Sequence, residues 1–184
     1  MALTTGAIMP RPETRQFIIE VIRQVEWAGP VIDLGAGKYS DCYRDLFGTA
    51  QYKTLDFEQN KLNHIDIIAD ILSMPQVASN SYGVVLLLDT LEHVKNPFTA
   101  FEESARILKP DGLFICSTVA SWVEHKHPRD YWRFLHDGLA LLCTGTNLKI
   151  FRKETTAPAT CIPCQVIIAA KKTDKKNEDN DAKI

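Results

Sequence analysis

The sequence predicts an α/β domain with a mainly parallel sheet and helices on both of its faces. Short apolar runs alternate with amphipathic stretches along most of the chain. Residues 83–88 are apolar at every position, as expected for a strand that is covered on both faces. The last two apolar runs leave no room for a helix between them, so one of them should run antiparallel.

The individual elements follow from periodicity and from turn residues. The first helix shows apolar residues at helical spacing from Phe17 to Val25, and Gly29 and Pro30 then stop it. Pro97 suits the first turn of the second helix, and residues 109–112 predict a turn before the next strand. Helices are expected over residues 11–27, 97–108 and 137–143, and strands over residues 31–34, 51–55, 65–68, 83–88, 113–117, 148–153 and 165–171.

Length and composition indicate one globular domain over residues 1–172, followed by a disordered polar tail over residues 173–184. The net charge of −2 argues against a general nucleic-acid or membrane surface. No apolar run is long enough to span a bilayer, and no signal peptide is visible. The five cysteines favour a reduced, cytoplasmic protein. Cys161 and Cys164 form a lone C-x-x-C, for which packing is a better explanation than metal or redox chemistry.

A glycine-containing turn follows the first expected strand. Gly35-Ala36-Gly37 comes directly after Asp33 and Leu34, and glycines allow a ligand to approach the backbone closely. Ser40 stands where a G-x-G-x-x-G pattern would have its third glycine. Alone, the pattern fits an ordinary strand-to-helix turn as well as a nucleotide site. Its position after the first strand favours binding.

Acidic residues follow the next three strands. Asp56, with Phe57 beside it, comes about twenty residues after the glycines, where a carboxylate can accept hydrogen bonds from ribose hydroxyls. Asp70 with Ile71 follows the third strand, and Asp89 follows the fourth. Each alone could be a solvated turn residue, and Glu58 competes with Asp56. Ligands of open α/β sheets bind beyond the carboxyl ends of the strands, and all of these segments lie there.

Together these motifs resemble the class I S-adenosylmethionine-dependent methyltransferases, in particular the type 11 group. Residues 31–37 resemble the first motif of that group, 69–75 its adenine motif and 91–94 its motif after the fourth strand. Residues 106–112 resemble the R-x-L-K-P-G-G turn before its fifth strand, with Asp111 in place of the first glycine. The resemblance implies a Rossmann-like, seven-stranded, mostly parallel sheet whose last strand is antiparallel. It also implies S-adenosyl-L-methionine as the cofactor.

The resemblance assigns roles within the cofactor site. Gly35 and Gly37 would lie beside the methionine portion, and Asp33 would orient the glycine loop. Asp56 would bind the ribose, and Asp70 would receive the adenine amino group. The expected cofactor-binding residues are Asp33, Gly35, Ala36, Gly37, Asp56, Phe57, Asp70, Ile71 and Asp89.

A second candidate segment, residues 125–134, follows the fifth strand and combines histidines, an acid, basic residues and aromatics. Similar H-x-x-D-Y-W-R-F stretches occur in type 11 relatives that accompany glycan and lipid-saccharide synthesis. The segment is expected to cover the acceptor pocket, with Tyr131, Trp132 and Arg133 contacting substrate. A structural role, in which the aromatics hold a loop and Arg133 pairs with an acid, is equally well supported. The candidate general bases are His127, His125 and His93.

No metal is expected, because His125 and His127 lie two residues apart with no obvious third ligand. The predicted function is therefore methyl transfer from S-adenosylmethionine to a small molecule or a glycan or lipid-saccharide precursor. A nicotinamide oxidoreductase, a catalytically silent binding or regulatory relative, and an enzyme active only as a dimer are the alternatives. No nucleic-acid partner and no membrane span are expected, and the chain should be a monomer or a homodimer.

Overall fold

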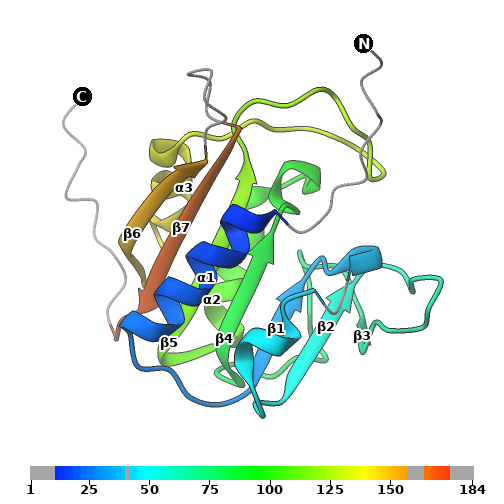
Figure 1. Cartoon of the computed structure of the whole chain (residues 1–184). Helices are drawn as coiled ribbons and strands as arrows, with labels where there is room; N and C mark the ends of the chain where they lie inside the picture. The colour runs from blue at the N-terminus through cyan, green and yellow to red at the C-terminus, as the bar shows by residue number, and fades with distance from the viewer. Residues whose placement is uncertain (1–10, 40–41, 157–163, 175–184) are drawn as a thin grey trace.

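The computed structural model describes residues 11–39, 42–156 and 164–174, which form one mixed seven-stranded sheet (Figure 1). The strand order is β3-β2-β1-β4-β5-β7-β6. Strands β1 to β5 pair in parallel, and β7 runs antiparallel to both β5 and β6. The expected Rossmann-like sheet is thereby confirmed. The strands are β1 Val31–Leu34, β2 Tyr52–Asp56, β3 Ile67–Ile68, β4 Tyr82–Leu88, β5 Leu108–Val119, β6 Leu148–Thr156 and β7 Gln165–Lys172.

Helices cover both faces of the sheet, as expected. Helix α1, Pro12–Gln24, packs on one face through Phe17, Ile18 and Val21. Helices α2, Pro97–Ile107, and α3, His136–Cys143, pack on the other face. Two apolar clusters therefore bury the sheet from opposite sides. The central strand β4 is buried at every position after Tyr82, which explains why its sequence is continuously apolar.

Several expected boundaries differ by a few residues in the structure, and two of the differences have a clear local cause. Strand β3 begins at Ile67 rather than at residue 65, because the backbone N–H and C=O of Ile65 pair with the Gln59 side chain instead of a strand. The expected turn at residues 109–112 lies inside β5 as a register irregularity, with Asp111 at a φ of 58°. Aspartate tolerates this left-handed conformation better than most residues. The substitution of aspartate for glycine therefore leaves the turn intact.

Some expectations concern residues outside the described ranges. Ser40, Cys161 and residues 175–184 are among these, so the third-glycine position, the C-x-x-C pair and the polar tail stay predictions. The division into residues 1–172 and a tail is likewise a prediction. Within the described ranges, no helix is long and apolar enough to cross a membrane.

An ion pair on α2 fixes the loop that follows β3. The Arg106 guanidinium donates to the Glu103 carboxylate at 2.6 Å and to the backbone carbonyls of Met74 and Val77 at 2.9 and 2.8 Å. The Met74 N–H donates to Glu103 at 3.0 Å. The hydrogen bond from Arg106 is the main reason why the pKa of Glu103 lies below its ordinary value of 4.5. This pair holds the loop that carries Asp70.

We expect Glu103→Gln to lower the free energy of unfolding at pH 7 by about 1–2 kcal/mol, the usual cost of losing a charge-assisted hydrogen bond. Because the folded-state pKa of Glu103 is lowered, its charge stabilises the fold above about pH 4.5, and this contribution is lost as pH falls through the folded-state pKa. Urea unfolding at pH 7 and pH 3 should show the gap between wild type and variant closing at low pH. Glu102→Gln, at an exposed position on the same helix, is the control. A gap that persists at pH 3 would contradict the assignment.

Candidate active site

The glycine turn after β1 adopts a backbone that other residues rarely reach. Gly35 and Gly37 have φ angles of 73° and 55°. The N–H groups of Gly35 and Ala36 both donate to the carbonyl of Leu55 at the end of β2. A Cβ at Gly35 would lie 2.2 Å from the methyl carbon of Thr90, so only glycine fits there. The loop is therefore held between the ends of β2 and β4.

Two aspartates lie beside and beneath this loop. The Asp56 carboxylate accepts hydrogen bonds from the N–H of Gly37 at 2.8 Å and from the N–H of Phe57 at 2.7 Å. Asp33, with 4% of its surface exposed, accepts a hydrogen bond from the Tyr52 hydroxyl at 3.0 Å. The sequence correctly indicated that these acids follow or end strands beside the glycines. Their roles in binding a cofactor stay predictions.

The expected adenine-binding residues lie beyond the end of β3. Asp70 is exposed, and one of its oxygens accepts the N–H of Leu72 at 2.8 Å. Ile71 is buried, whereas the Phe57 ring beyond β2 is 55% exposed. An exposed carboxylate and an exposed ring near the ends of neighbouring strands suit a flat, polar-edged ligand. The hydrogen bond to Leu72 also gives Asp70 a structural role in the turn.

Asp89 is held more tightly than the sequence indicated. It has a φ of 46°, and its Oδ1 accepts hydrogen bonds from Gln165 at 2.5 Å and from Ser117 at 3.3 Å. The Nε of Arg11 lies 3.6 Å from its other carboxylate oxygen. These contacts connect the ends of β4, β5 and β7. The Asp89 carboxylate therefore stabilises the fold through most of its interactions.

The three candidate bases come together, although they lie in two separate segments. The ring centroids of His93 and His125 are 4.8 Å apart, and the His127 centroid lies 5.6 Å from His93 and 6.0 Å from His125. His93 belongs to the short helix Leu91–His93 after β4, and the other two follow β5. Parallel neighbouring strands bring these segments to the same edge of the sheet. Burial lowers the pKa of His93, which favours its neutral form.

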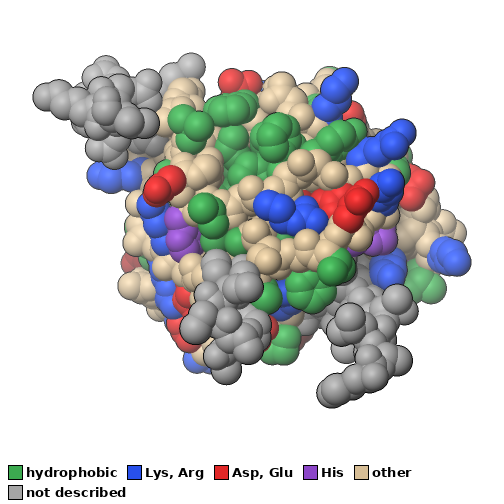
Figure 2. Space-filling view, turned by 90° about the horizontal axis from the view of Figure 1, so that it is seen from above, with side chains coloured by type: hydrophobic (Ala, Val, Ile, Leu, Met, Phe, Trp, Pro, Cys, Tyr) green, Lys and Arg blue, Asp and Glu red, His purple; other side chains and the backbone are tan. Residues whose placement is uncertain are grey.

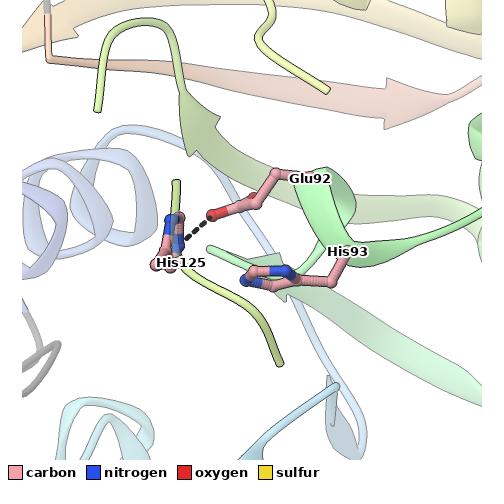
Figure 3. Close-up of side chains that lie close together, drawn as sticks. All are labelled: Glu92, His93 and His125. Atoms are coloured by element: carbon pink, nitrogen blue, oxygen red, sulfur yellow. Dashed lines mark ion pairs between the residues drawn. The ribbon is translucent and has the colours of Figure 1, made fainter. Parts of the chain in front are cut away.

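Glu92 is a functional candidate that the sequence reasoning missed. Its side chain is completely buried, and its Oε2 accepts a hydrogen bond from the Thr118 hydroxyl at 2.7 Å. Burial, aided by the Asp89 charge, raises the pKa of Glu92 to about 7. Figure 3 shows its carboxylate pointing toward His125, at a distance of 3.9 Å from Nε2. Its only sequence signal was its place in the 91–94 motif, because glutamate is rarely fully buried.

The segment after β5 has a rigid internal frame. Arg133 forms a two-pronged ion pair with Asp130, with distances of 2.6 and 2.8 Å, and its other N–H groups reach the carbonyls of residues 122, 123 and 132. This ion pair lowers the pKa of Asp130 well below its ordinary range. The N–H groups of Tyr131 and Trp132 donate to the Glu92 carbonyl at 2.8 and 3.3 Å. Arg133 therefore shapes the loop, and its contact with substrate stays a prediction.

The aromatic side chains of this segment are accessible from outside. Tyr131 and Trp132 are 48% and 41% exposed, and the Trp132 indole N–H donates to the Val94 carbonyl. Trp132 and Phe98 also line an apolar cavity of about 410 Å³ between helices α2 and α3. Seen from the edge where the parallel strands end, hydrophobic side chains gather among charged ones (Figure 2). This face therefore presents both apolar and ionic side chains.

Residues 32–116 match the family model that describes a methyltransferase domain. The match covers 85 of the 184 residues. The match agrees with the family that the motifs indicated, and for this chain that family and its cofactor, S-adenosylmethionine, stay predictions. The matched residues include the glycine loop, Asp56, Asp70 and the Glu92–His93 pair, but not the segment after β5.

One curated protein and two solved structures are similar to parts or most of this chain. A ubiquinone biosynthesis O-methyltransferase of Maricaulis maris is 39% identical over 29% of this chain, and the matched region spans only 26% of that relative. The 1,6-didemethyltoxoflavin-N1-methyltransferase of Burkholderia thailandensis, solved with S-adenosylhomocysteine, has a TM-score of 0.69 at 16% identity, over 89% of this chain and 78% of that chain. The [4+2]-cyclase SpnF has a TM-score of 0.67 at 14% identity, over 88% of this chain and 80% of that chain. At these identities the solved structures show the fold alone.

We expect Gly37→Ala to weaken binding of S-adenosylhomocysteine at least tenfold without unfolding the chain. A Cβ at Gly37 would lie no nearer than 3.9 Å to a neighbouring atom, yet it would add bulk where a nucleotide must approach the backbone. Gly48→Ala is the matched control, because Gly48 has a φ of 58° and open space around its Cβ position. Both positions have a positive φ, so each alanine variant introduces backbone strain, and thermal unfolding of both variants checks that they remain folded. Equal affinities of the two variants in calorimetric titration would remove Gly37 from the cofactor site.

Proposed function

We propose that the chain transfers the methyl group of S-adenosylmethionine to a small-molecule acceptor at the edge where β1, β4 and β5 end. One observation carries this proposal: Thr90 lies against Gly35 in the glycine loop, two residues before the Glu92–His93 pair. A cofactor cradled by the glycine loop would therefore have its methyl group close to the histidine cluster. We define the histidine cluster as His93, His125 and His127.

Methyl transfer requires the protein mainly to align the acceptor with the methyl group of the cofactor. The sulfonium is itself a strong electrophile, so the protein chiefly positions a nucleophile in line with the methyl group and excludes competing water. An acceptor hydroxyl also needs a base, and a neutral imidazole is suited to this at physiological pH. His127 is the leading base, because its ring is exposed beside the other two. His93 and His125 have one ring nitrogen each occupied by a backbone carbonyl.

The relatives narrow the acceptor class that we propose. The Maricaulis relative is named an O-methyltransferase, and the Burkholderia structure is described with bound 1,6-didemethyltoxoflavin. The exposed aromatic side chains of the 125–134 segment suit a flat or apolar molecule. We therefore propose a small molecule with an ionisable hydroxyl group. A glycan or lipid-saccharide precursor with such a group falls within this class.

A second candidate function is binding or chemistry without methyl transfer. SpnF shares this fold and is described as a cyclase, so the fold alone does not imply methyl transfer. The rigid hydrogen-bonded frame around Asp130 and Arg133 would equally support a binding surface. Incorporation of label from tritiated S-adenosylmethionine into a small-molecule extract distinguishes the two functions.

We expect His127→Ala to reduce that incorporation by about 10²–10⁴-fold, the usual contribution of a general base, while the affinity for S-adenosylhomocysteine stays unchanged. His64→Ala, at an exposed position before β3 at the far edge of the sheet, is the control and should retain full activity. Full activity of His127→Ala would exclude His127 as the base. Loss of cofactor affinity in the same variant would assign it to the cofactor site instead.

A further inference from the structure

Glu92, His93 and His125 converge in a way that the methyl-transfer chemistry does not require. One potential ligand atom from each side chain lies within 4.8 Å of the others (Figure 3). Two of these residues come from the short helix after β4, and the third comes from the segment after β5. The sequence offered no third ligand beside His125 and His127. The fold supplies two, from more than thirty positions earlier in the chain.

Backbone carbonyls determine which nitrogen of each imidazole carries the proton. The Nδ1 of His93 lies 2.5 Å from the carbonyl oxygen of Arg129. The Nδ1 of His125 lies 3.1 Å from the carbonyl oxygen of Val123 and 3.3 Å from the Asp130 carboxylate. Oxygen acceptors of this kind require a protonated Nδ1. In the neutral rings each Nε2 therefore presents a lone pair.

The glutamate adds a third lone pair to this group. Glu92 is completely buried, and its Oε1 has no hydrogen-bond partner among the described residues. The Nε2 of His125, 3.9 Å away, is buried and also lacks a partner within the described part of the chain. Three potential ligand atoms thus face one another, and two of them, Glu92 Oε1 and His125 Nε2, have no partner among the described residues. Leaving buried acceptors unsatisfied is costly, and a cation shared with His93 would satisfy both of these atoms.

We propose that Glu92, His93 and His125 bind a divalent transition-metal ion, for which zinc is the best match. Two imidazoles and one carboxylate form a ligand set that zinc uses where it keeps a further position open for water or an oxygen ligand. Zinc ligands at about 2.0–2.1 Å lie about 3.3 Å apart in a tetrahedron, so the separations between the three ligand atoms must shrink by at most about 1.5 Å. His93 is only partly buried, which allows its ring to move.

The surroundings match those of metal-binding imidazoles. Ligating histidines usually donate their second N–H to a carbonyl or carboxylate, which fixes the ring and increases its basicity. Arg129 provides such an acceptor for His93, and Val123 and Asp130 provide them for His125. Thr118 orients the Glu92 carboxylate through its Oε2. The arrangement thus includes the supporting contacts as well as the three ligands.

The test is titration of the full, tag-free chain with zinc by calorimetry after treatment with a chelator. Cobalt(II) serves as a second probe, because tetrahedral coordination gives visible absorption bands. We expect one zinc ion per chain, bound at least tenfold more weakly by Glu92→Gln and by His93→Gln. His64→Gln should bind zinc as wild type does. His93→Gln is the safer variant, because His93 is less buried than Glu92 and its loss leaves the core intact.

Two results would overturn the metal site: no stoichiometric zinc binding, or unchanged binding by a folded His93→Gln variant. A parallel titration of the metal-free chain with S-adenosylhomocysteine separates this inference from the proposed function. Cofactor binding without zinc binding refutes the metal site alone. Zinc binding without cofactor binding supports the metal site and refutes the proposed methyl transfer.

Discussion

The contact between Gly35 and Thr90 is the constraint on which the rest of the site depends. A side chain at Gly35 would overlap the Thr90 methyl group, so the loop after β1 can approach the loop after β4 only because Gly35 has no Cβ. The Thr90 hydroxyl donates to the Leu88 carbonyl at 2.9 Å, which keeps this segment close to the end of its strand. The spacing between the glycine loop and the Glu92–His93 pair therefore follows from one close backbone approach.

Glu92 connects the loop after β4, which contains Thr90, with the segment of residues 125–134. Its carbonyl accepts the N–H groups of Tyr131 and Trp132, and its carboxylate faces His125. Burying a carboxylate with one hydrogen-bond donor, Thr118, is unfavourable for stability. Perturbed, buried ionisable groups at the edge of a sheet are typical of functional sites. The burial of Glu92 is therefore an observation that the proposed metal site explains and that stability alone does not.

The sequence predicted the strands well because burial on both faces makes them continuously apolar, as β4 shows. It also located the glycine loop and the acids after the strands, since these follow strand ends directly. It could not show that His93 and His125 meet, because that contact depends on the pairing of β4 with β5. Nor could it show that Arg133 pairs with Asp130, since the charge of an arginine fits a substrate contact equally well. Glu92 was overlooked because its burial results from packing beneath a distant segment.

The most direct test of the central claim is calorimetric titration of the purified wild-type chain with S-adenosylhomocysteine and, separately, with NADH. The account predicts binding of one S-adenosylhomocysteine per chain and no measurable binding of NADH. Ribose and adenine are common to both ligands, so the comparison isolates the part of the site formed by the glycine loop and the segment after β4. Binding of NADH without binding of S-adenosylhomocysteine would contradict the account.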